Sequence, residues 1–171
     1  MKKGIIRRII RILGVVIPIA VLLFFYLFIV KVYVVPTKSM EPTIKAEDII
    51  LSDGIAYRKK TIARQEVVLL KDGEETVVKR VIGIPGDEVV LSEAGVYVNG
   101  QQLYEPYVKD IGQESSDVYD VPAGCYFVLG DNRKDSLDSR SWENPYVEKE
   151  RIVGKGFVAM GIKDGPHISF F

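Results

Sequence analysis

The chain has 171 residues, enough for one globular domain and an appendage. Its formal net charge is zero, but six of the 23 basic residues and none of the 23 acidic residues precede position 32, which leaves 17 basic against 23 acidic residues in the remainder. An acidic remainder without a basic stripe argues against nucleic acid as a partner. With one cysteine and one histidine the chain forms no intrachain disulfide, and we expect neither a metal site nor a cofactor.

The first feature along the chain is an uninterrupted apolar run from Ile12 to Val30, flanked by Arg11 and Lys31. As a helix this run would be roughly 29 Å long, which matches a hydrocarbon core of about 30 Å. A cleavable leader segment is the alternative, but the run is long for one and no small-x-small pair follows it. We therefore expect an uncleaved single-pass anchor in residues 1–31, with the basic tail in the cytoplasm and residues 32–171 on the extracytoplasmic face of the cell membrane.

Strand and turn patterns dominate after residue 32. The sequence predicts a mainly β fold, barrel-like or built of folded antiparallel sheets, on a single N-terminal transmembrane helix. The expected strands are Asp48–Leu51, Tyr126–Leu129, Ile152–Met160 and two hairpins, one from Glu66 to Ile84 with a type I′ turn at Asp72-Gly73 and one from Val96 to Leu103 with Asn99-Gly100 at its turn. Residues 104–122 are polar and predict an irregular surface excursion.

A short stretch close after the apolar run, Val35-Pro36-Thr37-Lys38-Ser39-Met40-Glu41-Pro42-Thr43, brackets a serine with two prolines. The prolines prevent a helix from continuing through it. An ordinary linker beside a membrane would have this composition. A serine held in such a turn is also a candidate nucleophile, and the rest of the chain must decide between the two interpretations.

Lys79 lies in a strand pattern in which it shares a face with Val77 and Val81, while Arg80 shares the opposite face with Val78 and Ile82. Burial among apolar side chains lowers the pKa of a lysine, and a neutral lysine can serve as the general base for a serine without any histidine. The alternative is that one of the two cations reaches solvent from a half-buried strand.

A third stretch, Gly130 to Arg140, opens with turn residues and continues with alternating charges and two serines, Ser136 and Ser139. Such a segment forms either a solvated loop or a scaffold that orients a lysine base. Cys125 lies in a strand-like context that favours a small buried residue over a reactive thiol.

Taken together, the three stretches resemble the type I signal peptidases, which are membrane-bound serine proteases. The residues that carry the resemblance are Pro36 to Thr43, Lys79 to Asp87, and Gly130 to Arg133 with Ser136, Asp138, Ser139 and Arg140. They occur in the family's order behind an anchor in the family's place, and they match the compact Gram-positive form. The chain departs from the family at Glu47-Asp48, where Gly-Asp is frequent, and at Glu143, where glycine is frequent.

The resemblance implies a Ser/Lys dyad of Ser39 and Lys79, with Ser136 orienting the lysine and the Thr37 hydroxyl joining the Ser39 N–H in the oxyanion hole. It implies structural support from Asp131, Arg133 and an ion pair between Asp138 and Arg140. It implies shallow apolar substrate subsites lined by Tyr33, Val35, Pro36, Met40, Val77 and Val78. Its substrates would be the signal peptides of preproteins, cleaved after small-x-small sites and bound as an added strand, at the bilayer surface and downstream of a secretion translocase.

Two other functions fit parts of this pattern. One is a protease dedicated to a narrow substrate such as a pilin or a transfer component. The other is a non-catalytic, membrane-tethered binding domain, which would have no need of Ser39, Lys79 and Ser136 together. A cysteine transpeptidase based on Cys125 is disfavoured because no histidine lies near it in the sequence.

Overall fold

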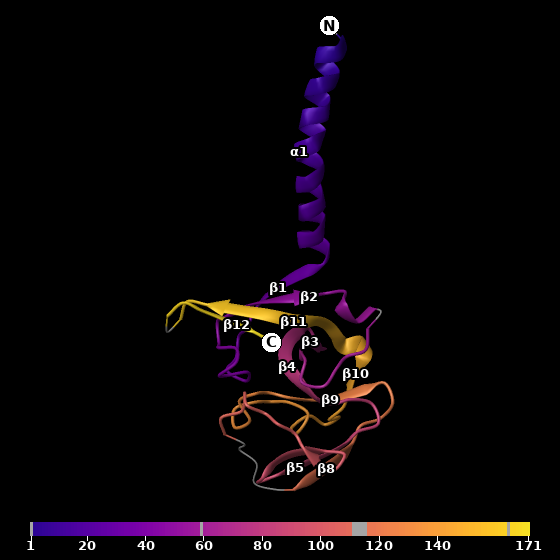
Figure 1. Cartoon of the computed structure of the whole chain (residues 1–171). Coiled ribbons are helices and arrows are strands. Elements are labelled where there is room, and N and C mark those ends of the chain that lie inside the picture. The colour runs from indigo at the N-terminus through magenta and orange to yellow at the C-terminus, as the bar shows by residue number, and fades with distance from the viewer. Residues whose placement is uncertain (1, 59, 111–115, 164) are drawn as a thin grey trace.

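The computed structural model describes the chain except for residues 1, 59, 111–115 and 164. Helix α1, Lys2–Phe28, extends away from the rest of the molecule (Figure 1). Its segment Gly4–Tyr26 is long and apolar enough to cross a membrane, with a mean hydropathy of 2.6 and no part of it buried. The expected span was placed too far along the chain, because the helix ends at Phe28 and Val30 already belongs to a strand.

The larger sheet is antiparallel throughout and has the order β1-β2-β11-β3-β4-β9-β10, with β12 paired to β11. Its strands are β1 Val30–Val34, β2 Ile49–Asp53, β3 Val67–Asp72, β4 Glu75–Gly83, β9 Cys125–Leu129, β10 Val147–Glu148, β11 Ile152–Gly161 and β12 His167–Phe170. Short 3₁₀ turns, η1 Ala56–Arg58 and η2 Lys149–Arg151, follow β2 and β10. The mainly β fold class is confirmed, and strands β9 and β11 occur where the sequence predicted them.

A smaller four-stranded sheet has the order β7-β6-β5-β8. It consists of β5 Glu88–Ser92, β6 Gly95–Val98, β7 Gln101–Gln102 and β8 Asp117–Asp120. The prediction of a wholly irregular excursion over residues 104–122 is wrong at β8, which pairs with β5 although its own sequence is polar. Because β8 is an edge strand and three of its four residues are exposed or acidic, it carries almost no hydrophobic pattern.

The two expected hairpins have different outcomes. Asn99 and Gly100 both adopt positive φ, at 53° and 76°, as a type I′ turn requires, so that prediction is confirmed. In the β3–β4 hairpin Asp72 pairs with Glu75, which moves the two-residue loop to Gly73-Glu74. Only Gly73 has a positive φ there, so the type I′ assignment at Asp72-Gly73 is wrong.

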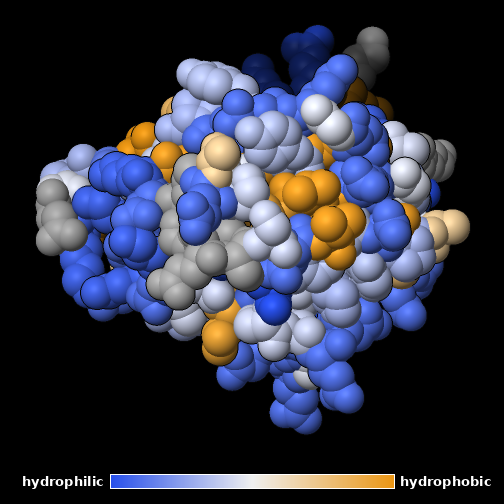
Figure 2. All heavy atoms as spheres, turned by 90° about the horizontal axis from the view of Figure 1, so that it is seen from below, coloured by the Kyte–Doolittle hydropathy of each residue, from blue (hydrophilic) through white to orange (hydrophobic). Residues whose placement is uncertain are grey.

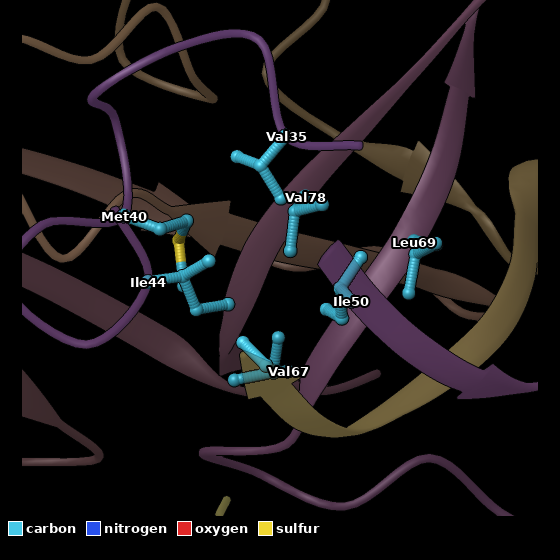
Figure 3. Packing of buried hydrophobic residues seen from close by; sticks show 8 residues of the cluster. Val35, Met40, Ile44, Ile50, Val67, Leu69 and Val78 are labelled. Carbon is cyan, nitrogen blue, oxygen red and sulfur yellow. The ribbon is translucent and has the colours of Figure 1, made fainter. Parts of the chain in front are cut away.

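One core cluster packs the segment that follows β1 against the larger sheet. Val35, Met40 and Ile44 meet Val78 of β4 and residues of β2 and β3 (Figure 3). Met40 and Ile44 have no exposed surface, which fixes the loop that carries Ser39. The face of the molecule turned away from α1 is mostly hydrophilic, with a compact hydrophobic group near its middle (Figure 2).

Candidate active site

The loop around Ser39 is held at its base and at its tip. At the base, Val35 exchanges backbone hydrogen bonds with the end of the loop, as its N–H donates to Asp48 O at 2.8 Å and its carbonyl accepts from Glu47 N at 2.7 Å. At the tip, Asn132 N–H donates to Ser39 O at 3.0 Å and Asn132 Nδ2 donates to Lys38 O at 3.2 Å. Ser39 is itself buried, so this stretch is a fixed part of the domain and the linker interpretation is wrong.

Lys79 lies on β4 and is only 3% exposed. Burial is the main reason that its pKa falls from the usual 10.5 to about 8; the nearby Arg140 lowers it further, while Asp138 opposes the shift. The Lys79 Nζ donates a hydrogen bond to Ser136 Oγ at 3.1 Å. The alternative in which one of the two adjacent cations reaches solvent is wrong, because Arg80 is buried as well.

Gly130 connects the nucleophile loop to the lysine. A Cβ atom at this position would lie within 3.0 Å of Ser39 O and of Ser136 Oγ, and 2.6 Å from Ser136 Cβ. The Ser39 backbone and the hydroxyl that accepts from Lys79 therefore flank the same glycine. Within the described residues no hydrogen bond joins Lys79 Nζ to Ser39 Oγ, whose partner is Thr37 Oγ1 at 3.1 Å.

The loop from Gly130 to Arg140 is ordered by Asp138, which is fully buried. Its carboxylate accepts from Arg140 Nε at 2.8 Å, from Arg140 Nη2 at 2.9 Å and from the Gly130 N–H at 3.0 Å. Arg140 also donates to Arg133 O at 2.8 Å. The expected ion pair between Asp138 and Arg140 is thus present, and it holds the glycine that lies between Ser39 and Ser136.

Two further ion pairs lie beside this loop, and the sequence did not indicate their partners. Arg80 forms a bidentate pair with Asp131, at 2.8 and 2.6 Å, and the Thr43 hydroxyl donates to the same carboxylate at 2.5 Å. Arg133 pairs with Glu105 at 2.5 Å. A buried arginine on an apolar strand requires a carboxylate partner, but that requirement does not say which carboxylate in the sequence supplies it.

The six residues expected to line substrate subsites divide into two groups. Val35, Met40 and Val78 are buried in the core cluster, so their side chains lie beneath the surface of the site. Tyr33, Pro36 and Val77 keep exposed surface. In this structure Met40 cannot touch a substrate directly, since it has no exposed surface, and its role is to support the loop.

Neither Cys125 nor His167 belongs to this site. Both ring nitrogens of His167 are engaged elsewhere, with Nε2 3.0 Å from Asp48 Oδ2 and Nδ1 3.1 Å from Gly165 O. The pKa of the Cys125 thiol is raised by burial, which keeps it protonated and poorly nucleophilic. Lys79, by contrast, lies beside the Ser136 loop that flanks the Ser39 backbone at Gly130.

Comparison with known proteins points to one family. The family model for signal peptidase, peptidase S26, matches residues 6–160. Signal peptidase IB of Staphylococcus aureus is 33% identical over 91% of this chain and 88% of its own length, and signal peptidase I of Bacillus caldolyticus is 36% identical over 75% and 78%.

Two further matches complete the comparison. A probable signal peptidase I-2 of Synechocystis is 37% identical over 77% of this chain, which spans 63% of the length of that protein. Among solved structures, a signal peptidase I from Enterococcus faecalis is 30% identical and superposes on 56% of this chain and 97% of its own, with a TM-score of 0.49.

Proposed function

The chain belongs to the signal peptidase family, peptidase S26, and we propose that it cleaves signal peptides from exported preproteins with Ser39 as nucleophile and Lys79 as general base. Membership in this family makes it a peptidase, a hydrolase of peptide bonds. The observation that carries the proposed dyad is the buried Lys79, whose pKa is lowered to about 8 and whose Nζ is aimed by Ser136.

In the proposed reaction Lys79 acts first as a base and then as an acid. Neutral Lys79 accepts the proton of the Ser39 hydroxyl as Ser39 Oγ attacks the scissile carbonyl carbon. The resulting ammonium then protonates the leaving amine, and the mature protein departs while the signal peptide remains as an acyl ester on Ser39. Lys79, neutral again, takes a proton from the water that hydrolyses this ester. One lysine thus serves both half-reactions as base and then acid.

Thr37 has to change partners during this cycle. In the free enzyme its hydroxyl lies 3.1 Å from Ser39 Oγ. When the carbonyl oxygen of the substrate becomes an oxyanion, the Thr37 O–H and the Ser39 N–H donate to it. A donor of this kind typically contributes a few kcal/mol of transition-state stabilisation.

An extended substrate could pair with one stretch of strand β4. From Glu75 to Lys79, strand β4 pairs only with β3 among the described residues, because its pairing with β9 begins at Arg80. The signal peptide adds along this edge, where its backbone is read and alternate side chains are tested. Val77 on this edge keeps exposed surface while its neighbour Val78 is buried; a shallow surface of this kind would suit small side chains at the −1 and −3 positions.

The length and hydropathy of α1 support a site close to a membrane. The basic residues before Leu13 stay in the cytoplasm, so the β domain lies on the outer face. Ser39 lies ten positions after Ile29, the residue that follows the helix, so even a fully extended chain keeps Ser39 within roughly 35 Å of the helix end.

The test uses the purified full chain and a preprotein with an Ala-x-Ala site. Ser39→Ala abolishes cleavage, and Lys79→Ala lowers kcat by about 10²- to 10⁴-fold. The matched controls are Cys125→Ala, which removes the thiol, and Lys71→Ala, which removes an exposed lysine on the neighbouring strand. Wild-type activity in either Ser39→Ala or Lys79→Ala contradicts the dyad.

A further inference from the structure

A second polar site lies where α1 joins the β domain. The Gly54 N–H donates to Ile29 O, one residue after the helix ends, at 2.9 Å. A Cβ atom at Gly54 would meet Lys31 Cγ at 3.1 Å, so the Lys31 side chain lies over this glycine. Figure 1 shows the segment after β2 at the level of β1 and β2, on the helix side of the domain. The head-group layer of a bilayer is roughly 5–8 Å thick on each side, and a bilayer spanned by Gly4–Tyr26 would have this layer next to Ile29, to which Gly54 is hydrogen-bonded.

Gly54 also lines a cavity of about 490 Å³ between the turns η1 and η2. Two cations line it, Arg58 from η1 and Lys149 from η2, together with one carboxylate, Glu150. Both cations are exposed, and neither they nor Lys31 form an ion pair with any described carboxylate. With Lys31 and the carboxylate of Asp53 next to Gly54 counted as well, three cations stand against two carboxylates at the end of α1.

This cluster is opposite in sign to the domain that carries it. Residues 32–171 hold 17 basic and 23 acidic residues, so an anionic bilayer surface repels the domain as a whole. The cations at the helix junction attract an anionic bilayer locally, so they favour an orientation in which the helix side of the domain faces the lipid. The face turned away from α1 is mostly hydrophilic, with a compact hydrophobic group near its middle (Figure 2).

We propose that this cavity binds the phosphate of an anionic phospholipid head group, with Arg58 and Lys149 as its ligands and Lys31 beside them. The inference rests on the proposed membrane anchoring, since α1 is what brings the cavity to the head-group layer. Occupation of the site fixes the rotation of the β domain about the helix junction, and so the height at which Ser39 meets its substrate.

Binding is measured by calorimetry on the full-length Ser39→Ala chain in a non-ionic detergent, with dihexanoylphosphatidylglycerol as the probe. With the lipid site unchanged, the Ser39→Ala chain binds dihexanoylphosphatidylglycerol saturably, at one molecule per chain. Arg58→Gln with Lys149→Gln weakens binding by roughly 30-fold, about 5-fold for each cation. The matched control, Lys71→Gln with Lys109→Gln, removes two other exposed lysines and leaves the affinity within about 2-fold of wild type.

Two further probes separate the sources of the phosphate. Dihexanoylphosphatidylcholine, with equal chains and no net charge, binds at least about 5-fold more weakly. Inorganic phosphate that binds as tightly as the anionic lipid overturns the proposal, as does unchanged lipid binding in the Arg58/Lys149 variant. The lipid-binding experiment uses a chain without its serine nucleophile, so its result does not depend on proteolysis. A negative lipid-binding result leaves the proteolysis test intact, and a negative proteolysis result leaves the lipid-binding test intact.

Discussion

Gly130→Ala is the substitution that tests most sharply how the site is assembled. The new methyl group would lie within 3.0 Å of Ser39 O and Ser136 Oγ and 2.6 Å from Ser136 Cβ. Ordinary van der Waals contact begins at 3.4 Å, so the nucleophile loop and the Ser136 loop must separate by about 1 Å. A displacement of about 1 Å in a catalytic constellation can lower the rate on the order of 10²-fold, and overpacking costs about 1–3 kcal/mol of stability.

The assay is kcat/KM on a preprotein with an Ala-x-Ala site, together with a thermal unfolding curve to show that the variant is folded. Gly14→Ala serves as the control, because a Cβ at Gly14 meets nothing within 4 Å and alanine favours a helix. We expect Gly130→Ala to lose about 10²-fold in kcat/KM while Gly14→Ala keeps wild-type activity. A folded Gly130→Ala protein with wild-type kcat/KM would show that the two loops need not meet at this glycine.

Three further predictions concern buried or paired charges and are read from unfolding curves. Asp131→Asn breaks the bidentate pair with buried Arg80 and should lower the free energy of unfolding in urea by about 3–5 kcal/mol. A decrease of less than about 1 kcal/mol contradicts this prediction. Because the pKa of Lys79 is lowered to about 8, the protonated lysine lowers the free energy of unfolding by about 3 kcal/mol below pH 8, and this loss fades as pH rises toward 10.5. Lys79→Met should therefore be more stable than wild type at pH 7. A less stable variant refutes this prediction. The hydrogen bond to Asp48 raises the pKa of His167, so the stabilisation by this pair is complete below the unfolded-state pKa of about 6.5 and disappears as pH rises through the folded-state value. The difference in Tm between wild type and His167→Gln should therefore be larger at pH 5.5 than at pH 9. An equal difference at the two pH values contradicts this prediction.

The sequence predicted the local parts of this fold well. The apolar run, the Asn99-Gly100 turn and the strands β9 and β11 each carry their own signal in a short window, through hydropathy, turn residues or β-branched side chains. The two register shifts in β11 lie next to Gly154 and Gly156, and a glycine inside a strand often marks such a bulge. Some errors are displacements at element ends, as at Phe28 and Gly73, and one is a missed element, strand β8.

What the sequence could not supply is the identity of partners brought together by the fold. Arg133 pairs with Glu105 from the polar excursion, and Arg80 with Asp131, 51 positions away. Strand β8 escaped prediction for a related reason, because an edge strand with little buried surface needs no hydrophobic alternation. The requirement for Gly130 also depends on two loops far apart in sequence, and only the structure reveals it.

The central claim, that Lys79 is the base for Ser39, is tested most directly by the pH dependence of kcat/KM for cleavage of a preprotein, with the new N-terminus identified by mass spectrometry. With the pKa of Lys79 at about 8, kcat/KM should fall tenfold for each pH unit below that value and reach about 1% of its plateau at pH 6. The His167→Gln variant should show the same acid limb. A profile that is flat from pH 6 to 9, or an acid limb near pH 6.5 that disappears in His167→Gln, would contradict the account.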